Sequence, residues 1–215
     1  MLALFDLNGV LIDSEPINKK IWKIMCEKHN IAFTENFYSL NIDGKKSEHV
    51  ADSVFNISDY TSFLNEKDAI WNTIMETYSI PIFDDAIRFL RILKKIGFKC
   101  CVVSASRNAG KVVQMSKLNE YIDLVIDGNN IRFGKPNPEI IFKAMNYFKE
   151  TQMNVVLFED SINGIEAGIA ANVVTIGIRC ISIVAKNKCY KNINTFDELQ
   201  PNELLHILKA NSIKP

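Results

Sequence analysis

Residues 2–16 read LALFDLNGVLIDSEP, and this stretch places a carboxylate at the end of a short apolar run. The run predicts a buried strand, and Gly9 permits a tight turn after Asp6. Two residues after Asp6 the chain carries an amide side chain, that of Asn8. The strand is the first indication of the fold, and the loop is the first indication of the chemistry.

Other apolar runs along the chain have the same character. They are rich in β-branched residues and lack clear alternation between apolar and polar positions, as strands covered on both faces do. Together with LALF (2–5), the predicted strands are FKCCVVS (98–104), YIDLVIDG (121–128), VVLFED (155–160) and VVTIGI (173–178).

Helical patterns lie between these strands. One is DDAIRFLRILKKIG (84–97), which carries acids in its first turn and lysines in its last, and another is NPEIIFKAMNYFK (137–149), which has an apolar stripe. Strands that alternate with helices predict an α/β fold whose core is a Rossmann-like parallel sheet flanked by helices.

Residues 16–79 break this alternation. INKKIWKIMCEKHN (17–30) places its apolar residues on one helical face, and residues 48–78 also have helical patterns without a convincing strand. We therefore predict an inserted α-helical domain at 16–79. The α/β core domain would then combine residues 1–15 and 80–215.

Composition narrows the classes of function. The 215 residues include 25 basic and 25 acidic side chains without a block of like charge, so we expect neither a nucleic-acid nor a membrane partner. The five cysteines are odd in number and favour reduced thiols, which predicts a cytoplasmic protein. No apolar run approaches 18 residues, so we expect no membrane-spanning helix and no export signal. We also expect the protein to be a monomer.

Polar residues stand where the predicted strands end. Ligands of open parallel sheets bind beyond the carboxyl ends of the strands, where this chain places Asp6, Ser104, Glu159 and Asp160. Adjacent carboxylates repel unless a cation lies between them, and Mg²⁺ prefers hard oxygen ligands of this kind. The alternative is that Asp160 or Ser161 only caps the next helix.

Two further stretches provide candidate anion ligands. VVSASRNAG (102–110) offers the hydroxyl of Ser104 and the backbone amide of Ala105, to which Arg107 and Asn108 could add donors. FGKPNPEI (133–140) holds Lys135 before a helix, where an ammonium could neutralise carboxylates and bind phosphate oxygens. The alternatives are a polar turn and an ordinary surface lysine.

Taken in order, four motifs resemble the haloacid dehalogenase superfamily, especially its β-phosphoglucomutase-like branch with a small helical cap. The matching stretches are FDLNGVLIDSEP, VVSASRN, GKPNPEIIFKA and FEDSINGIEAGIAA. They span nearly all of the predicted core, and the insert at 16–79 falls where this family carries its cap. The resemblance implies phosphoryl transfer to or from a small phosphorylated metabolite, with Mg²⁺ as cofactor.

The resemblance also implies a role for each candidate residue. Asp6 would be the nucleophile that forms an aspartyl-phosphate, and the phosphoryl group would be held by Ser104, the Ala105 amide and Lys135. The ligands of Mg²⁺ would be the Asp6 carboxylate, the backbone carbonyl of Asn8 and Asp160, with Glu159 beside them. Phosphoryl transfer needs little beyond in-line positioning and charge neutralisation, so these residue types suit the reaction.

Asn8 departs from the family pattern. The family has an Asp there, which protonates the leaving oxygen and then activates water. An amide can do neither, and the loss of general acid–base catalysis costs about 10²–10⁴ in rate. Either the chain is a weakened or inactive relative that still binds phosphoesters, or an Asp was deliberately replaced to slow turnover. The second alternative is favoured because every other motif is intact, and we expect Asn8→Asp to restore activity.

The insert contains a candidate substrate loop, NIDGKKSEHV (41–50), in which Gly44 permits close approach and Lys45 and Lys46 could reach a second anionic group. A solvated turn is the alternative. Ser47 stands where β-phosphoglucomutases have an Arg, which favours hydrolysis of a small ester such as a sugar phosphate over a mutase reaction. A non-catalytic phosphoester-binding or partner-binding protein remains the third possibility.

Overall fold

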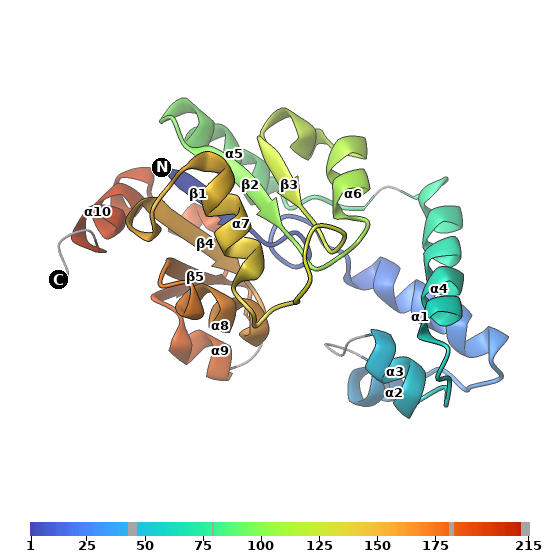
Figure 1. Ribbon diagram of the computed structural model, residues 1–215. Helices are drawn as coiled ribbons and strands as arrows, with labels where there is room; N and C mark the ends of the chain where they lie inside the picture. Colours follow the sequence, from blue (N-terminus) through green and yellow to red (C-terminus); the bar gives the residue numbers. More distant parts are fainter. Residues whose placement is uncertain (43–46, 79, 181–182, 212–215) are drawn as a thin grey trace. The chain divides into compact units, whose positions relative to one another are not determined.

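The computed structural model describes residues 1–42, 47–78, 80–180 and 183–211 (Figure 1). The chain divides into two compact units, of which one combines Met1–Asp13 with Pro81–Pro215 and the other is Ser14–Ile80. The predicted substrate-loop residues Gly44, Lys45 and Lys46 lie outside the described residues. No helix in the described ranges is both long and apolar enough to span a membrane.

The first unit is built on a six-stranded sheet in which every pair of neighbouring strands is parallel. Its order is β3-β2-β1-β4-β5-β6, so the strand that begins the sequence lies inside the sheet. The strands are β1 (Leu2–Phe5), β2 (Lys99–Val103), β3 (Leu124–Ile126), β4 (Val155–Glu159), β5 (Val174–Ile178) and β6 (Lys191–Ile193). The predicted α/β fold with a parallel sheet is confirmed. The sequence analysis missed β6 because its three residues, KNI, carry no apolar run.

Helices lie on both sides of the sheet, and all but the last, α10, stand between strands in the sequence (Figure 1). They are α5 (Asp84–Lys95), α6 (Ala109–Met115), α7 (Glu139–Phe148), α8 (Ile162–Ala170), α9 (Ile183–Lys188) and α10 (Pro201–Asn211). Short 3₁₀ turns are η1 (Lys117–Glu120), η2 (Gln152–Asn154) and η3 (Phe196–Glu198). The acids predicted to open α5 are in its first turn, where they complement the helix dipole.

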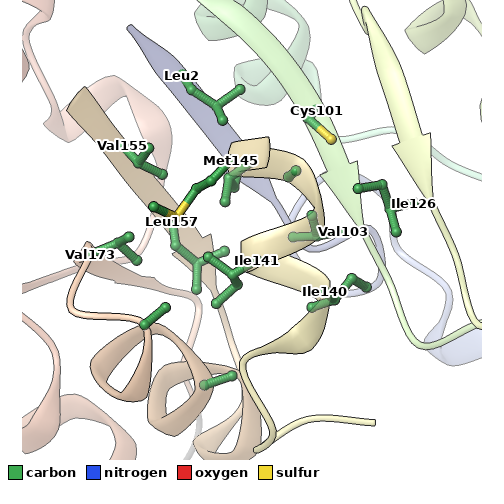
Figure 2. Close-up of a cluster of buried hydrophobic side chains, with 14 residues drawn as sticks. Leu2, Cys101, Val103, Ile126, Ile140, Ile141, Met145, Val155, Leu157 and Val173 are labelled. Carbon is green, nitrogen blue, oxygen red and sulfur yellow. The ribbon is translucent and has the colours of Figure 1, made fainter. Parts of the chain in front are cut away.

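Two hydrophobic layers cover the sheet. On one face, Ile140, Ile141 and Met145 of α7 pack against strand residues that include Leu4 and Leu157 (Figure 2). Neighbouring strand residues point to the opposite face, where an aromatic cluster combines Phe5, Phe89, Phe158 and Phe196. The rings of Phe5 and Phe158 stack with centroids 4.9 Å apart. Burial on both faces explains why the strand sequences lack alternation.

The second unit consists of helices and connecting loops in its described part. Its helices are α1 (Glu15–Lys28), α2 (Glu35–Asn41), α3 (Ser47–Ser53) and α4 (Tyr60–Met75). Thr34 caps α2 by accepting a hydrogen bond from the Phe37 amide, and Asp59 caps α4 in the same way. Ile17, Ile21 and Met25 of α1 are buried in a core that this unit forms by itself. Its role as a cap domain stays a prediction.

Candidate active site

Three side chains from distant parts of the sequence meet at the carboxyl edge of the sheet. β1 and β4 are paired so that Phe5 lies opposite Phe158. Asp6 and Glu159, which directly follow these two residues, are therefore neighbours. Lys135 lies between their side chains. Its Nζ donates to Asp6 Oδ1 at 2.6 Å and to Glu159 Oε2 at 2.5 Å. All three side chains are buried, so the ion pairs are shielded from water.

The loop after β1 is tight. The Asp6 amide donates to the Phe158 carbonyl at 3.0 Å, and the Gly9 amide donates to the Ile12 carbonyl at 2.9 Å. Gly9 has a positive φ of 69°, and a Cβ at this position would lie 2.1 Å from Asp160 Oδ2. Glycine is therefore required both for the backbone conformation and for the approach of Asp160.

The three acids form a group that could hold a metal ion. Asp6, Glu159 and Asp160 each offer a carboxylate oxygen, and these atoms all lie within 4.8 Å of one another. One ammonium, from Lys135, accompanies these three carboxyl groups, so the group has an excess of negative charge when all are ionised. Hard oxygen donors with this charge fit Mg²⁺.

Burial and mutual repulsion act on these acids. Burial raises the pKa of the Asp6 carboxyl to about 6, although Lys135 opposes the shift. Burial, followed by the nearby charges of Glu159 and Asp6, raises the pKa of Asp160 to about 9. Burial disfavours the charge of Lys135, but the carboxylates outweigh it and its pKa lies above the ordinary value. A cation near Asp160 would relieve this repulsion.

Glu159 has more contacts than the sequence predicted. Its Oε1 accepts hydrogen bonds from the Ser161 hydroxyl at 2.9 Å and the Ser161 amide at 3.3 Å, while Oε2 accepts from Lys135. A Cβ on Gly164 would lie 1.9 Å from Glu159 Cδ, so α8 approaches the carboxylate closely. Ser161 is also the N-cap of α8, which settles the alternative of Asp160 or Ser161 in favour of Ser161.

Of the anion-binding candidates in the loop after β2, Ser104 comes directly after the strand. It follows β2, which pairs with the other side of β1, and it is 1% exposed. Its hydroxyl accepts a hydrogen bond from the Ser106 amide at 3.2 Å. Ala105 is exposed, and its carbonyl packs against Gly128, where a Cβ would come within 2.4 Å.

The two remaining candidates in this loop have other contacts. Arg107 is exposed and donates to Asn129 Oδ1 at 3.4 Å, and its carbonyl accepts from Asn129 Nδ2 at 2.8 Å. The backbone amide of Asn108 donates to the Ser106 hydroxyl at 3.3 Å. The structure thus joins Arg107 to the loop after β3 rather than to the buried carboxylates. Asn8 is half-buried in the loop after Asp6 and pairs with Ile12.

Glu139 was absent from the sequence-based candidates. It lies in the first turn of α7, and its Oε2 accepts hydrogen bonds from the backbone amides of Phe133 at 2.8 Å and Arg132 at 3.0 Å. The carboxylate therefore ties the loop that carries Lys135 to the helix that follows it. An acid four residues after the lysine was the available signal, but a helix N-terminus alone explains an acid there.

Comparison with known proteins agrees with this geometry. Residues 3–178 match a family model described as haloacid dehalogenase-like hydrolase. A phosphorylated carbohydrates phosphatase of Thermotoga maritima is 24% identical, over 96% of this chain and 97% of its own length. A beta-phosphoglucomutase of Mycobacterium bovis is 26% identical, over 82% of this chain and 80% of its own length. The structure of a HAD hydrolase of family IA, variant 3, from Entamoeba histolytica has a TM-score of 0.84 at 27% identity, covering 97% of this chain and 99% of that one.

Proposed function

This chain belongs to the haloacid dehalogenase-like hydrolase family, and we propose that it is a Mg²⁺-dependent phosphatase acting on a small phosphomonoester such as a sugar phosphate. The observation that carries the proposal is the group of Asp6, Lys135, Glu159 and the half-buried Asp160 at the carboxyl edge of the sheet, in which the first three side chains are buried. Relatives that match most of the chain are named as a carbohydrate phosphate phosphatase and as a phosphomutase. The helical unit Ser14–Ile80 would be the cap domain of the family.

Asp6 is the proposed nucleophile. One of its carboxylate oxygens attacks phosphorus, the bond from phosphorus to the ester oxygen breaks, the alcohol leaves with a proton from solvent, and an aspartyl-phosphate forms. Water then attacks the phosphorus, and the bond to Asp6 breaks to release phosphate. Lys135 lies against Asp6 and Glu159, where its ammonium can offset charge on the equatorial phosphoryl oxygens. Ser104 and the Ala105 amide are the proposed hydrogen-bond donors to the same oxygens.

The metal would be held by Asp6, Asp160 and the backbone carbonyl of Asn8, with Glu159 behind them. Bound Mg²⁺ supplies charge stabilisation for the transferring phosphoryl group. Glu159 itself is engaged by Lys135 and Ser161, so its proposed role is to keep the ammonium of Lys135 beside Asp6.

Asn8 limits this chemistry because its amide neither donates a proton to the leaving alcohol nor accepts one from water. The natural test compares the unaltered chain with Asn8→Asp on a panel of phosphomonoesters, with Mg²⁺ and with EDTA. We expect the variant to gain about 10²–10⁴ in turnover, and only in the presence of Mg²⁺. Equal rates for the two proteins would rule out a missing acid–base group.

The two alternatives are separable by their products and adducts. A phosphomutase would convert one sugar phosphate isomer into another without releasing phosphate, which nuclear magnetic resonance of the products distinguishes. A non-catalytic phosphoester-binding protein would not form a stable beryllium fluoride adduct at Asp6. Formation of that adduct in the presence of Mg²⁺ would support Asp6 as a nucleophile.

A further inference from the structure

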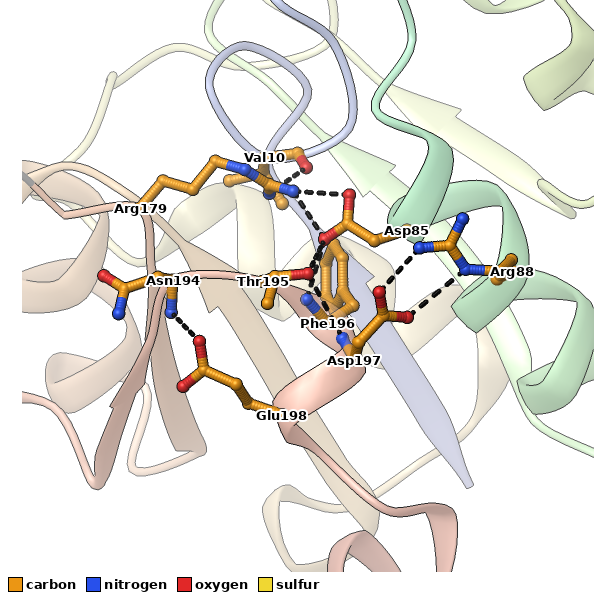
Figure 3. Close-up of polar contacts among 9 residues, drawn as sticks. All are labelled: Val10, Asp85, Arg88, Arg179, Asn194, Thr195, Phe196, Asp197 and Glu198. Atoms are coloured by element: carbon orange, nitrogen blue, oxygen red, sulfur yellow. Dashed lines mark hydrogen bonds and ion pairs between the residues drawn. The ribbon is translucent and has the colours of Figure 1, made fainter.

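Arg179 makes an unusual set of contacts directly after β5. One terminal nitrogen, Nη1, donates to the backbone carbonyl of Val10 at 3.1 Å. The other, Nη2, lies 2.6 Å from both carboxylate oxygens of Asp85 (Figure 3). The guanidinium also stacks over the ring of Phe83, with its central carbon 3.9 Å from the ring centroid. These contacts restrict the guanidinium on several sides.

Asp85 is itself held in place. It lies in the first turn of α5 and accepts hydrogen bonds from the Thr195 hydroxyl at 2.8 Å and from the Phe196 amide at 2.7 Å (Figure 3). Burial opposes its charge, but these hydrogen bonds and Arg179 lower the pKa of Asp85 below its usual value. The carboxylate is therefore a firmly placed anchor, and it orients Arg179 towards Val10.

Val10 belongs to the loop that carries Asp6 and Asn8. Inside that loop, the amides of Leu11 and Ile12 both donate to the Leu7 carbonyl. From outside, the start of α5 provides a backbone hydrogen bond, from the Phe83 amide to the Leu11 carbonyl at 3.0 Å. Arg179 adds a side-chain tie one residue earlier, at Val10, and it links the loop to α5 through Asp85.

The backbone of Arg179 indicates that its side chain matters. Its φ is 54°, in the left-handed region that non-glycine residues rarely adopt. Three of the other described non-glycine residues with positive φ are asparagines, which tolerate this conformation. A strained backbone persists where surrounding contacts over-determine it, and here the contacts are those of the guanidinium together with the hydrogen bond from the Arg179 backbone amide to the Ile193 carbonyl at 2.9 Å.

We propose that Arg179 is a positioning residue for the reaction: anchored by Asp85, it holds the Val10 carbonyl and thereby fixes the loop that presents Asp6 and Asn8. This inference rests on the proposed function for its kinetic consequence. Its structural part, the restraint of residues 6–12, is independent of what the enzyme hydrolyses. Arg179 touches neither substrate nor metal in this proposal and acts only through the loop.

The first test is Arg179→Gly, because glycine adopts the positive φ readily and the variant removes only the side chain. In hydrogen exchange followed by mass spectrometry, peptides covering residues 6–12 should exchange faster, while peptides of β2 and α7 should be unchanged. In the Asn8→Asp background, kcat should fall about 10–100-fold with KM little changed, as for supporting contacts around other catalytic groups.

Two further substitutions sharpen the test. Arg179→Lys keeps the positive charge but loses the planar fork that reaches Val10 and Asp85 with separate nitrogens, and it should give intermediate exchange and kcat. Arg88→Gln is the matched control, because Arg88 lies on α5, as Asp85 does, near this network, but its partner is the exposed Asp197, at 2.6 Å. It should leave both the exchange of residues 6–12 and kcat unchanged.

Normal exchange of residues 6–12 in folded Arg179→Gly would overturn the proposal. If that variant does not fold, Asp85→Asn replaces it, since Asn retains an acceptor but loosens the anchor, and unchanged exchange in this variant would overturn the proposal equally. If neither the unaltered chain nor Asn8→Asp hydrolyses any phosphoester, the proposed function fails. The exchange measurement would still decide the role of Arg179.

Discussion

At the scale of single residues, the proposed site depends on one ammonium, which lies between two acids and would neutralise charge during transfer. Lys135 contacts Asp6 and Glu159, and all three are removed from water. Buried charges of this kind are tolerated when they are paired and hydrogen-bonded, whereas an unpaired one is strongly destabilising. Lys135 therefore serves both the stability of the folded core and the proposed transfer.

Lys135→Met tests both roles. Turnover in the Asn8→Asp background should fall at least about 100-fold, because a positive charge facing the phosphoryl oxygens is lost. The free energy of unfolding at pH 8 should fall by about 3–5 kcal/mol, since two buried carboxylates lose their partner. Without the ammonium, the pKa of the Asp6 carboxyl, which burial already raises to about 6, would rise further, so the loss should shrink as the pH falls and Asp6 becomes protonated.

Urea unfolding at pH 8 and pH 5 measures the second effect. The control is Lys188→Met, which removes an exposed lysine paired with Glu166 and should change the free energy of unfolding by less than about 1 kcal/mol. An equal loss of stability at both pH values would argue against buried carboxylates as its cause.

At the scale of elements, the site depends on how closely α8 approaches β4. Ser161 caps the helix and also donates to Glu159, so one side chain links the helix start to the buried carboxylate. Gly164 and Gly168, one helical turn apart, both face neighbours too near for a side chain. At Gly164 that neighbour is Glu159, whereas at Gly168 it is Thr175 of β5.

These two glycines provide a matched pair of substitutions. Each change to Ala should cost about 1–3 kcal/mol of stability through overpacking. Only Gly164→Ala should displace Glu159 from Lys135, and only this variant should lose kcat strongly in the Asn8→Asp background. Thermal unfolding and steady-state kinetics on both variants provide the comparison. Similar kcat losses in the two would show that α8 packing, and not Glu159, is limiting.

At the scale of the whole molecule, the acidic group joins segments far apart in the sequence. Asp6 follows β1 and Asp160 follows β4, so a cation bound between them would link the two halves of the sheet unit. A ligand that binds only the folded chain stabilises it by mass action. When the free ligand concentration is 100 times the dissociation constant, the free energy of unfolding rises by about 2.7 kcal/mol. Mg²⁺ should therefore raise the midpoint of thermal unfolding.

Asp160→Asn should lose the stabilisation by Mg²⁺ and should make the metal-free chain more stable. In the folded, metal-free chain the pKa of Asp160 is raised to about 9, well above its value in the unfolded chain. Ionisation therefore favours the unfolded state increasingly as the pH rises from about 4 towards 9. In EDTA at pH 7.5 the variant should be about 1–3 kcal/mol more stable than the unaltered chain.

Calorimetric scans with EDTA and with Mg²⁺ check this prediction. Asp127→Asn is a suitable control, since Asp127 lies beyond β3 and caps its own turn by accepting from the Asn129 amide. If Mg²⁺ stabilises Asp160→Asn as much as the unaltered chain, Asp160 is not a metal ligand.

Sequence patterns predicted the sheet wherever strands were apolar and ended in polar residues. They also identified Asp6, Glu159 and Asp160, because each follows directly from an apolar run. β6 was missed because the chain there is short and polar. Arg179 was missed because a single arginine after a strand carries no local signal of what its side chain reaches.

By itself, the sequence determined the parallel sheet, the helical insert pattern and the acids at the strand ends, because periodicity and strand termination are properties of neighbouring residues. Only the tertiary structure decided which of those residues meet. Lys135 is 129 positions from Asp6 and 24 from Glu159, and Arg179 is 169 from Val10. Such contacts follow from strand order and register, which place β1 beside β4 and are set by the packing of the whole sheet.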